Sequence, residues 1–256
     1  MCRLAGYVGS PIPLAEALYR APHSLEKQAY EPREQIHGAV NVDGTGVAWW
    51  NGDDPEPLRY VTPLAPWQDA NLPALSERLT SGIFLAAVRS ASPGIAIGPS
   101  NVAPFVVDTM AAVHNGRITG FRGELGRELV SSLSGDAYTH FHAVNDSLAL
   151  FLTVIDRYTD DLVLATTAAL AHVDALVKKH DSDATLNLVV SDGAGIVAAH
   201  HSVNAPLNTL YTSQRSGGSW VVSEPLDDDP DWTPVPDHHL VHLTSSGITT
   251  HPLEAS

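Results

Sequence analysis

The one cysteine in this 256-residue sequence, Cys2, stands directly behind the initiator methionine. If Met1 is removed, Cys2 carries a thiol and a free α-amine on the same carbon atom. An α-amine titrates near pH ~7.7–8.0 and a free thiol near ~8.5, so the two groups exchange a proton around neutrality. The position therefore predicts an N-terminal nucleophile that supplies its own base. The alternative to a nucleophile is that Cys2 is a small apolar side chain in the core. If Met1 is retained, Cys2 has no free α-amine.

Two charged residues stand at the ends of predicted apolar elements. Arg89 follows the predicted strand 83–88, and Asp146 precedes an apolar helix that starts near Ser147. A charge beside a buried element needs a partner or a ligand. The local sequence leaves two alternatives open for these residues, which are a salt bridge at the sheet rim for Arg89 and a helix cap for Asp146.

A possible oxyanion site follows the predicted strand 110–113. The sequence His114-Asn115-Gly116 combines a side-chain amide with a glycine whose backbone N–H is accessible. Two such donors suit the negative oxygen that develops during acyl transfer. Asn-Gly is also a common hairpin turn, so the pair alone does not decide between the two interpretations.

The elements that must position these residues alternate between strands and helices. Residues 2–8 predict a strand with Cys2, Leu4 and Val8 on one face and Arg3, Ala5 and Tyr7 on the other, ended by Pro11 and Pro13. Helices are expected over 14–20, 23–30, 74–80, 123–133, from 147, and over 162–179; further strands are expected over 47–50, 185–191, 195–201, 209–212, 220–223, 240–243 and 248–251. Strands near both termini with helices between them favour two stacked sheets covered by helices, in one domain over residues 1–256.

Composition narrows the class of protein. Fourteen basic and twenty-nine acidic side chains give a net charge of −15, which argues against nucleic acid as a partner. A single cysteine excludes an internal disulfide and a cysteine-rich zinc site, and it suits a reducing cytoplasm. No apolar run reaches the ~18–20 residues of a membrane span. We expect a cytoplasmic protein with no membrane partner.

The thirteen histidines raise a different hypothesis, a metal-binding protein. They include His140-x-His142, His200-His201 and His238-His239. Adjacent residues of a strand point to opposite faces, and the dispersed spacing matches no compact metal motif. We expect no metal site. The other hypothesis that does not involve an enzyme is a binding protein of the same fold.

Four segments together resemble a known family. They are Met1–Tyr7, Ala87–Ala91, His114–Gly116 and Asn145–Ser147, and in this order they are similar to the class II glutamine amidotransferases. That family consists of N-terminal-nucleophile hydrolases with an α+β fold, a four-layer αββα sandwich of two antiparallel sheets. The resemblance implies Cys2 as the nucleophile, Asn115 and the Gly116 N–H as the oxyanion hole, and no cofactor. It also implies that Arg89 binds the α-carboxylate of the substrate glutamyl group and that Asp146 binds its α-ammonium.

The sequence departs from the broader family at two motifs. Residues 101–105 read Asn-Val-Ala-Pro-Phe where the family often has Asn-x-His-Pro-Phe, so no histidine role transfers there. Residues 146–148 read Asp-Ser-Leu in place of Asp-Ser-Glu, which leaves Asp146 as the sole carboxylate of that motif.

Three further segments narrow the resemblance to one branch of the family. Gln28–Arg33, Ala103–Phe105 and Ser223–Trp232 resemble the actinobacterial hydrolases of ergothioneine biosynthesis. These enzymes remove the γ-glutamyl group from γ-glutamyl-hercynylcysteine S-oxide. The implied partner is a small γ-glutamyl substrate, cleaved through a γ-glutamyl thioester on Cys2. A stand-alone glutaminase or another γ-glutamyl amide hydrolase is the closest alternative.

The leaving group of that substrate carries a trimethylated amine, which cannot donate hydrogen bonds. Aromatic faces and carboxylates must therefore recognise it, at ~0.5–2 kcal/mol per cation–π contact. The resemblance locates Tyr30, Trp49, Trp50 and Trp67 near the mouth of the site. We expect at least one of the four to bind this group, and strand alternation allows only one of Trp49 and Trp50 to face the pocket.

Overall fold

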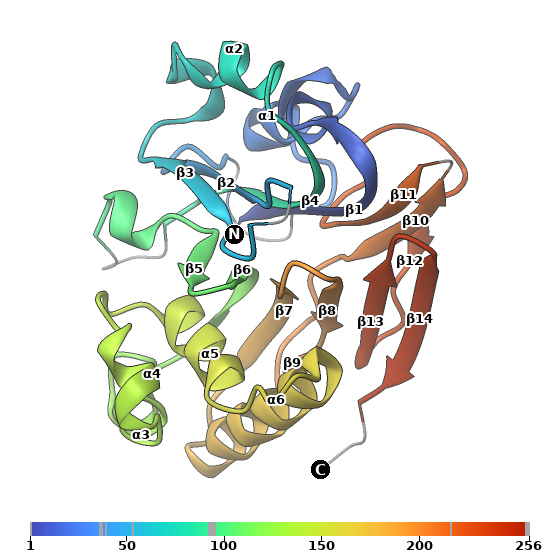
Figure 1. Cartoon of the computed structure of the whole chain (residues 1–256). Coiled ribbons are helices and arrows are strands. Elements are labelled where there is room, and N and C mark those ends of the chain that lie inside the picture. The colour runs from blue at the N-terminus through green and yellow to red at the C-terminus, as the bar shows by residue number, and fades with distance from the viewer. Residues whose placement is uncertain are drawn as a thin grey trace.

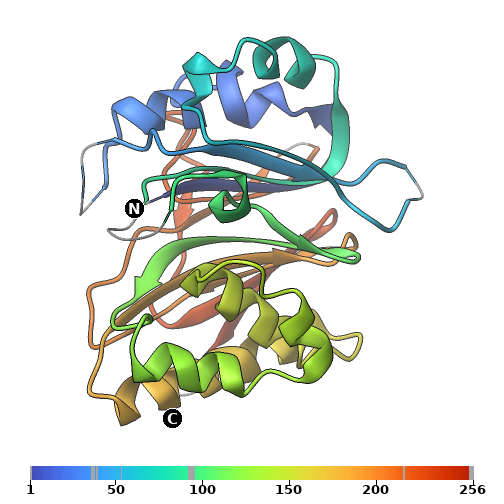
Figure 2. The same cartoon turned by 90° about the vertical axis from the view of Figure 1, so that its left-hand side faces the viewer.

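Two antiparallel sheets lie face to face between two layers of helices (Figures 1 and 2). The computed structural model describes residues 2–35, 38, 40–52, 54–91, 96–215 and 217–253. Each sheet has seven strands, and the strand order is β12-β10-β11-β1-β4-β2-β3 in the first sheet and β14-β13-β8-β7-β6-β5 in the second, where β9 also pairs with β7. The expected four-layer αββα sandwich of the α+β class is confirmed.

The first sheet contains β1 (Arg3–Pro13), β2 (Thr45–Trp49), β3 (Leu58–Thr62), β4 (Thr80–Val88), β10 (Tyr211–Arg215), β11 (Gly218–Val222) and β12 (Thr233–Pro234). The second contains β5 (Phe105–Val107), β6 (Met110–Ile118), β7 (Ala184–Ser191), β8 (Ile196–His200), β9 (Ser202–Val203), β13 (His239–Thr244) and β14 (Gly247–Pro252). Every strand pair in the described chain is antiparallel.

Helices cover the outer face of each sheet. The first sheet is covered by η1 (Glu16–Arg20), α1 (Leu25–Tyr30), η2 (Pro66–Gln68) and α2 (Leu72–Ser76), and the second by α3 (Glu124–Ser131), α4 (Gly135–Thr139), α5 (Asp146–Ile155) and α6 (Leu162–Lys179) (Figure 2). A short 3-10 turn, η3 (Pro99–Asn101), precedes β5. Ser24 caps α1 by accepting a hydrogen bond from the Lys27 N–H, and Asp161 caps α6 in the same way through the Leu164 N–H.

Strand alternation divides the interior into three apolar layers. In β1, Leu4 and Val8 join the core between the sheets, whereas Ala5 and Tyr7 pack against the helices outside the first sheet. The two faces predicted for residues 4–8 are therefore confirmed. In β6, Ala111 and Val113 face the first sheet, while Met110, Ala112 and Ile118 face the helices α3–α6.

Among the predicted strand ends that the structure corrects, those of β1 and β6 bear on the site. β1 continues through Pro11 to Pro13, because its pairing with β11 ends at Gly9 and only β4 accompanies it further. Proline is tolerated where one edge of a strand has no partner to receive its missing N–H. β6 continues through His114-Asn115-Gly116 to Ile118, paired with β7, so that Asn115-Gly116 lies inside a strand and is not a hairpin turn.

Candidate active site

Cys2 lies at the N-terminal end of β1, between the strands that flank β1 on either side. Its thiol is free and half-buried. Leu4 faces the second sheet, and a Cβ atom at Gly6 would lie 3.3 Å from the Ile196 Cδ1 of β8. Because alternate residues share a face, the Cys2 side chain is directed into the space between the sheets. Figure 2 shows this end of the chain between the two sheets. Met1 lies outside the described residues.

Arg89 lies beside Cys2 at the same end of the first sheet. Val88 of β4 pairs with Arg3 of β1, so Arg89 is the next residue along, toward Cys2. The Arg89 N–H donates to the Gly44 carbonyl at 2.8 Å, which continues the β2–β4 ladder and turns the side chain to the same face as Leu85 and Ala87. Arg89 is 6% exposed, and Nη1 donates only a long 3.5 Å bond, to the Asp43 carbonyl. Of the two buried arginines in the described chain, Arg3 has a carboxylate partner and Arg89 has none.

Asn115 faces the first sheet from β6. It is fully buried and shares the inner face with Ala111 and Val113. Its Oδ1 atom is 3.5 Å from the Asn208 Nδ2, but its own Nδ2 has no hydrogen-bond partner among the described residues. A buried amide donor without a partner costs roughly 1–3 kcal/mol. The position is therefore suited to an oxygen atom supplied by a ligand.

Gly116 is required by the close approach of β7. A Cβ atom at this position would lie 1.9 Å from the Thr185 carbonyl oxygen and 2.5 Å from the His114 Nε2. The Ile118 N–H, two residues later, donates to the Asp146 Oδ2 at 2.8 Å across the outer edge of β6. Since alternate residues of a strand direct their N–H groups to the same side, the Gly116 N–H faces this edge as well.

Asp146 is the first residue of α5 and is 8% exposed. Its carboxylate accepts from the Ile118 N–H and from the Ser147 N–H at 2.9 Å, and it forms no ion pair within the described part of the chain. The helix cap itself is Asn145, whose Oδ1 accepts from the Ser147 and Leu148 N–H groups. The cap interpretation of Asp146 is therefore wrong, and its charge remains unpaired.

His114 holds Ser147 beside Asp146. Burial lowers the pKa of His114 below its ordinary value, although the nearby Asp146 carboxylate opposes this shift. The neutral ring donates from Nε2 to the Thr185 carbonyl at 3.0 Å, so Nδ1 accepts from the Ser147 hydroxyl at 2.9 Å. The Ser147 hydroxyl therefore donates its proton to His114 and not to Asp146. The Asp146 Oδ1 can accept a hydrogen bond from a further donor.

A buried ionic network lies behind Cys2, on the outer face of the first sheet. The Arg3 Nη1 donates to the Glu224 Oε1 at 2.6 Å, and the His23 Nε2 lies 2.9 Å from the Glu224 Oε2. The Arg33 and Glu34 N–H groups also donate to this carboxylate. Burial raises the pKa of Glu224, but the hydrogen bonds from His23 and Arg33 together with the Arg3 charge outweigh it, and the pKa lies below its ordinary value.

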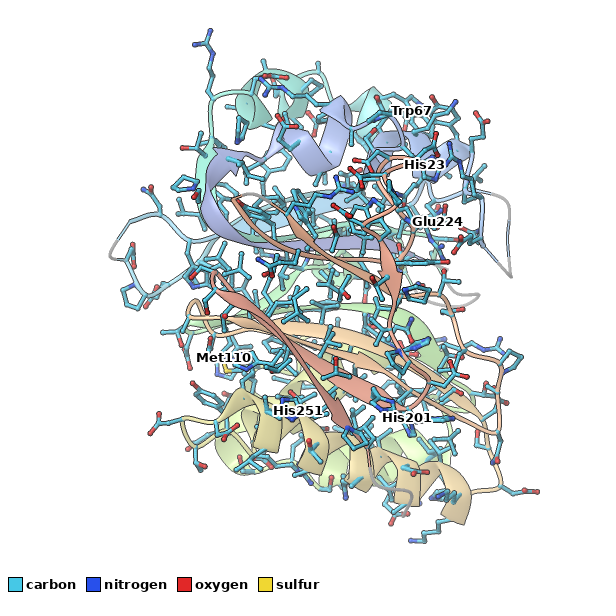
Figure 3. All side chains as sticks on the ribbon, turned by 90° about the vertical axis from the view of Figure 1, so that its right-hand side faces the viewer. His23, Trp67, Met110, His201, Glu224 and His251 are labelled. Carbon is cyan, nitrogen blue, oxygen red and sulfur yellow. The ribbon has the colours of Figure 1, made fainter. Side chains whose placement is uncertain are left out.

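The ionic network and β6 meet on the same side of the molecule. In Figure 3, His23 and Glu224 lie on one side and Met110, the first residue of β6, lies on the other. β6 therefore runs toward the Glu224 side, where its Asn115-Gly116 segment approaches the end of β1 that carries Cys2.

The four aromatic residues do not gather at one point. Trp49 and Trp50 are buried on opposite sides of the first sheet, as alternation predicts, and Trp49 pairs with Phe84. Phe84 lies four residues, about 13 Å, from the Val88 that pairs with Arg3. Both tryptophans belong to the core at the other end of β2, which gives no support to a substrate-binding role for either.

Tyr30 and Trp67 are the two accessible members of the set. They are 48% and 45% exposed and form an edge-to-face pair with ring centroids 5.5 Å apart. Lys27 Nζ lies 5.0 Å from the Tyr30 ring centre. In Figure 3, Trp67 lies in the outer helical layer on the same side as His23 and Glu224.

The structure thus brings Cys2, Arg89, Asn115, Gly116 and Asp146 to one end of the sandwich. Sequence reasoning missed three buried residues near this site. Glu224 pairs with Arg3, Asn208 donates to the Asn115 carbonyl, and Asn187 donates to the Asn208 carbonyl. Glu224 lies in a segment that the resemblance already quoted, but nothing in its spacing pointed to Arg3.

The described residues contain no cluster of three or more His, Cys, Asp or Glu side chains arranged to hold a metal ion. His200 is buried against the backbone carbonyls of Val235 and Asn208, whereas His201 contacts His238 through the two Nδ1 atoms at 2.9 Å. Among the helices of the described chain, none has the length and apolar character to cross a bilayer.

Comparison with known proteins identifies the family. The sequence is 33% identical over 253 residues to the γ-glutamyl-hercynylcysteine sulfoxide hydrolase of Mycolicibacterium smegmatis, which covers 99% of this chain and 100% of that protein. The protein of the same name from Mycobacterium tuberculosis is 32% identical over 254 residues, covering 99% and 97%. No protein-family model matches the sequence.

Solved structures agree with these relatives. A glutamine aminotransferase class-II domain protein from Silicibacter pomeroyi has a TM-score of 0.76 and 25% identity, with 100% of both chains covered. The fold, the position of Cys2 and the relatives all indicate an amidohydrolase that acts on γ-glutamyl amides. The chain belongs to the class II glutamine amidotransferase family, in the branch that contains the γ-glutamyl-hercynylcysteine sulfoxide hydrolases.

Proposed function

We propose that this enzyme hydrolyses γ-glutamyl-hercynylcysteine S-oxide to glutamate and hercynylcysteine S-oxide. The names of its relatives supply the substrate. The observation that carries the proposal is a pair of buried charges at the Cys2 end of the sandwich, the Arg89 cation and the Asp146 anion, neither of which forms an ion pair with another described residue. A buried charge without a partner is unfavourable unless a ligand completes it. The α-carboxylate and α-ammonium of a glutamyl group supply one charge of each sign.

The proposed reaction is acyl transfer to water through Cys2. After removal of Met1, the α-amine takes the thiol proton and Sγ attacks the γ-carbonyl carbon. The carbonyl oxygen becomes an oxyanion bound by Asn115 Nδ2 and the Gly116 N–H. The C–N bond then breaks as the departing amine takes the proton from the Cys2 ammonium, which leaves a γ-glutamyl thioester. Water, deprotonated by the same amine, attacks the thioester and releases glutamate and the thiol.

A cavity of about 280 Å³ supports a cationic leaving group. It is lined by Arg33, Glu34, Glu224, Pro225, Asp227, Asp228, Asp229 and Trp232. Ser223 is hydrogen-bonded to Leu4, so the cavity wall starting at Glu224 continues past the N-terminal end of β1. Glu224, Asp227 and Asp228 are paired with Arg3, Arg215 and Arg33, whereas Glu34 and Asp229 form no ion pair among the described residues. One oxygen of Glu34 is buried without a hydrogen-bond partner among the same residues. Such a wall favours a trimethylammonium group over a neutral ammonia leaving group.

Steady-state kinetics test the substrate. The trimethylated γ-glutamyl sulfoxide should have a higher kcat/KM than its unmethylated histidine analogue and than glutamine. Trp232, Tyr30 and Trp67 should each be changed to Leu separately. The preference for the trimethylated substrate should fall in the variant that lacks the residue in contact with the cation. Trp50→Leu, in the distant core, is the control. Equal kcat/KM for the three compounds would instead indicate a less selective γ-glutamyl hydrolase or a glutaminase.

Mass spectrometry of the intact protein tests the covalent step. Brief exposure to substrate should add the mass of one glutamyl group to a chain that has lost Met1. A turnover-competent protein that retains Met1 would exclude the N-terminal amine as the base.

A further inference from the structure

Three buried asparagines meet at the Cys2 end of the sandwich. Asn115 of β6 and Asn187 of β7 are fully buried and lie directly opposite each other in the ladder. Val113 and Val189 on the same strands face the first sheet, so both asparagine side chains point toward that sheet as well. Asn208, 3% exposed, lies in the connection between β9 and β10.

Asn208 is bonded to both of the other asparagines. Its Nδ2 donates to the Asn115 carbonyl at 3.0 Å and approaches the Asn115 Oδ1 at 3.5 Å. The Asn187 Nδ2 donates to the carbonyls of Asn208 and Thr209 at 3.0 and 3.1 Å. The His200 Nε2 lies 2.8 Å from the Asn208 carbonyl, which fixes the backbone from the other side.

Two polar atoms of this cluster are left without partners in the described part of the chain. One is the donor Asn115 Nδ2 and the other is the acceptor Asn187 Oδ1. Both residues are fully buried, so water does not satisfy these atoms from the surface. A folded chain tolerates buried polar atoms without partners where a ligand supplies the missing hydrogen bonds. They are the two side-chain atoms of these asparagines that are buried without a hydrogen-bond partner among the described residues.

The same connection links the asparagines to the strand of Cys2. The Thr209 hydroxyl donates to the Ser223 carbonyl at 2.8 Å. The Ser223 N–H donates to the Leu4 carbonyl, and the Leu4 N–H donates to the Ser223 hydroxyl, each at 3.0 Å. Hydrogen bonds on either side of the Asn208–Thr209 peptide bond thus link Asn115 on the second sheet to Leu4 on the first sheet, two residues from Cys2.

This link matters because the nucleophile and the oxyanion donor belong to different sheets. The apolar core between the sheets is non-directional and does not by itself fix their relative position to a few tenths of an ångström. An asparagine amide also has two orientations that differ by the exchange of Nδ2 and Oδ1. With Oδ1 toward the site, Asn115 would repel an oxyanion.

We propose that Asn208 is a positioning residue for the oxyanion hole. Its amide holds the Asn115 backbone and Oδ1, so that the Asn115 Nδ2 faces the reacting carbonyl, and its connection sets the distance between that donor and Cys2. Asn187 supports this role by fixing the Asn208 carbonyl. The inference rests on the proposed function, specifically on the oxyanion role of Asn115.

Asn208→Ala tests the proposal with γ-glutamyl-p-nitroanilide as substrate. Because a misplaced catalytic group slows the reaction without weakening glutamyl binding, kcat should fall by about 10- to 100-fold, while KM changes by less than about threefold. Asn204→Gly is the matched control. Asn204 lies in the same connection and is exposed, and its Nδ2 donates to the Ser182 carbonyl. Its positive φ of 54° is one that glycine adopts freely, so kcat should not change.

A double-mutant cycle separates positioning from general damage to the fold. In an Asn115→Ala background no side-chain amide remains to be oriented and only the bond to the residue 115 carbonyl is left, so Asn208→Ala should lower kcat by clearly less than it does in the unmodified enzyme. A full additional loss would overturn the proposal, as would a rise in KM with kcat unchanged. If Asn208→Ala does not fold, the near-isosteric Asn208→Asp gives the same comparison, since its carboxylate cannot donate to Asn115.

The two levels of the hypothesis fail in different ways. If the unmodified enzyme releases no glutamate from any γ-glutamyl amide, the proposed function fails and the positioning role fails with it. If the unmodified enzyme is active and Asn208→Ala keeps its kcat, only the positioning role is refuted.

Discussion

The buried network behind Cys2 offers a sharp stability prediction through Glu224→Gln. Glutamine has nearly the same shape but removes the charge that faces Arg3 at 2.6 Å, and both side chains are at most 1% exposed. The carboxylate also accepts hydrogen bonds from the Arg33 and Glu34 N–H groups. An amide presents an NH₂ group to at least one of these donors, so the substitution leaves an unpaired guanidinium and an unfavourable donor–donor contact.

The expected loss follows from the burial of the pair. Removing one partner of a buried ion pair costs about 3–5 kcal/mol, because the remaining charge stays desolvated. For a chain of this length, 1 kcal/mol corresponds to roughly 2–4 °C, so the unfolding temperature should fall by roughly 6–20 °C. Thermal unfolding followed by circular dichroism measures this shift.

Asp228→Asn is the matched control for that measurement. Asp228 is four residues from Glu224 and pairs with Arg33 at 2.8 Å, but its side chain is 84% exposed. Exposed pairs contribute about 0–1 kcal/mol, so the unfolding temperature should change little. Equal shifts for the two variants would refute the assignment of Glu224 as the critical partner of Arg3. A double substitution to Arg3→Met and Glu224→Gln should recover part of the loss, because no buried guanidinium is left without a partner.

The Glu224 carboxylate also predicts that the free energy of unfolding decreases at acidic pH. The pKa of Glu224 in the folded chain lies below its ordinary value, because hydrogen bonds from His23 and Arg33 and the Arg3 charge outweigh burial. Such a group adds stability above the pKa of the unfolded chain, about 4.3, and this contribution is lost as pH falls through the lower folded-state pKa. Unfolding free energy in urea should therefore depend less on pH below about 4.3 in Glu224→Gln. An unchanged slope would assign this decrease to other carboxylates.

Local pattern predicted most of the elements and the two faces of β1. Alternation in β1 divided Leu4 and Val8 from Ala5 and Tyr7 correctly, because each face of that strand meets a different apolar layer. The same reasoning failed for β6. The Asn115-Gly116 pair has the composition of a turn, but β7 pairs with it from about 70 residues further along the sequence, and only that tertiary contact shows that the strand continues.

The partners of the site were beyond the reach of sequence reasoning. Glu224 is separated from Arg3 by 221 residues and Asn208 from Asn115 by 93, so no helical or strand periodicity connects them. The aromatic residues show the converse problem. Trp49 and Trp50 were expected near the mouth of the site, but Trp49 pairs with Phe84, so both lie at the opposite end of β2.

Three substitutions test the proposed chemistry directly. Cys2→Ala should abolish turnover with an unchanged unfolding temperature, and residues fused ahead of Cys2 should do the same; activity in either protein would exclude the N-terminal mechanism. Arg89→Met should lose discrimination between substrates with and without an α-carboxylate, whereas retained discrimination would make Arg89 a structural cation. Asn115→Ala should lower kcat by roughly 10²–10³-fold, or about 2.7–4 kcal/mol, because one oxyanion donor is removed. Its KM should stay constant, since the Asn115 Nδ2 has no partner among the described residues and the glutamyl charges are proposed to bind Arg89 and Asp146. A rise in KM with constant kcat would show that this amide binds the ground state, and the oxyanion would then require another donor.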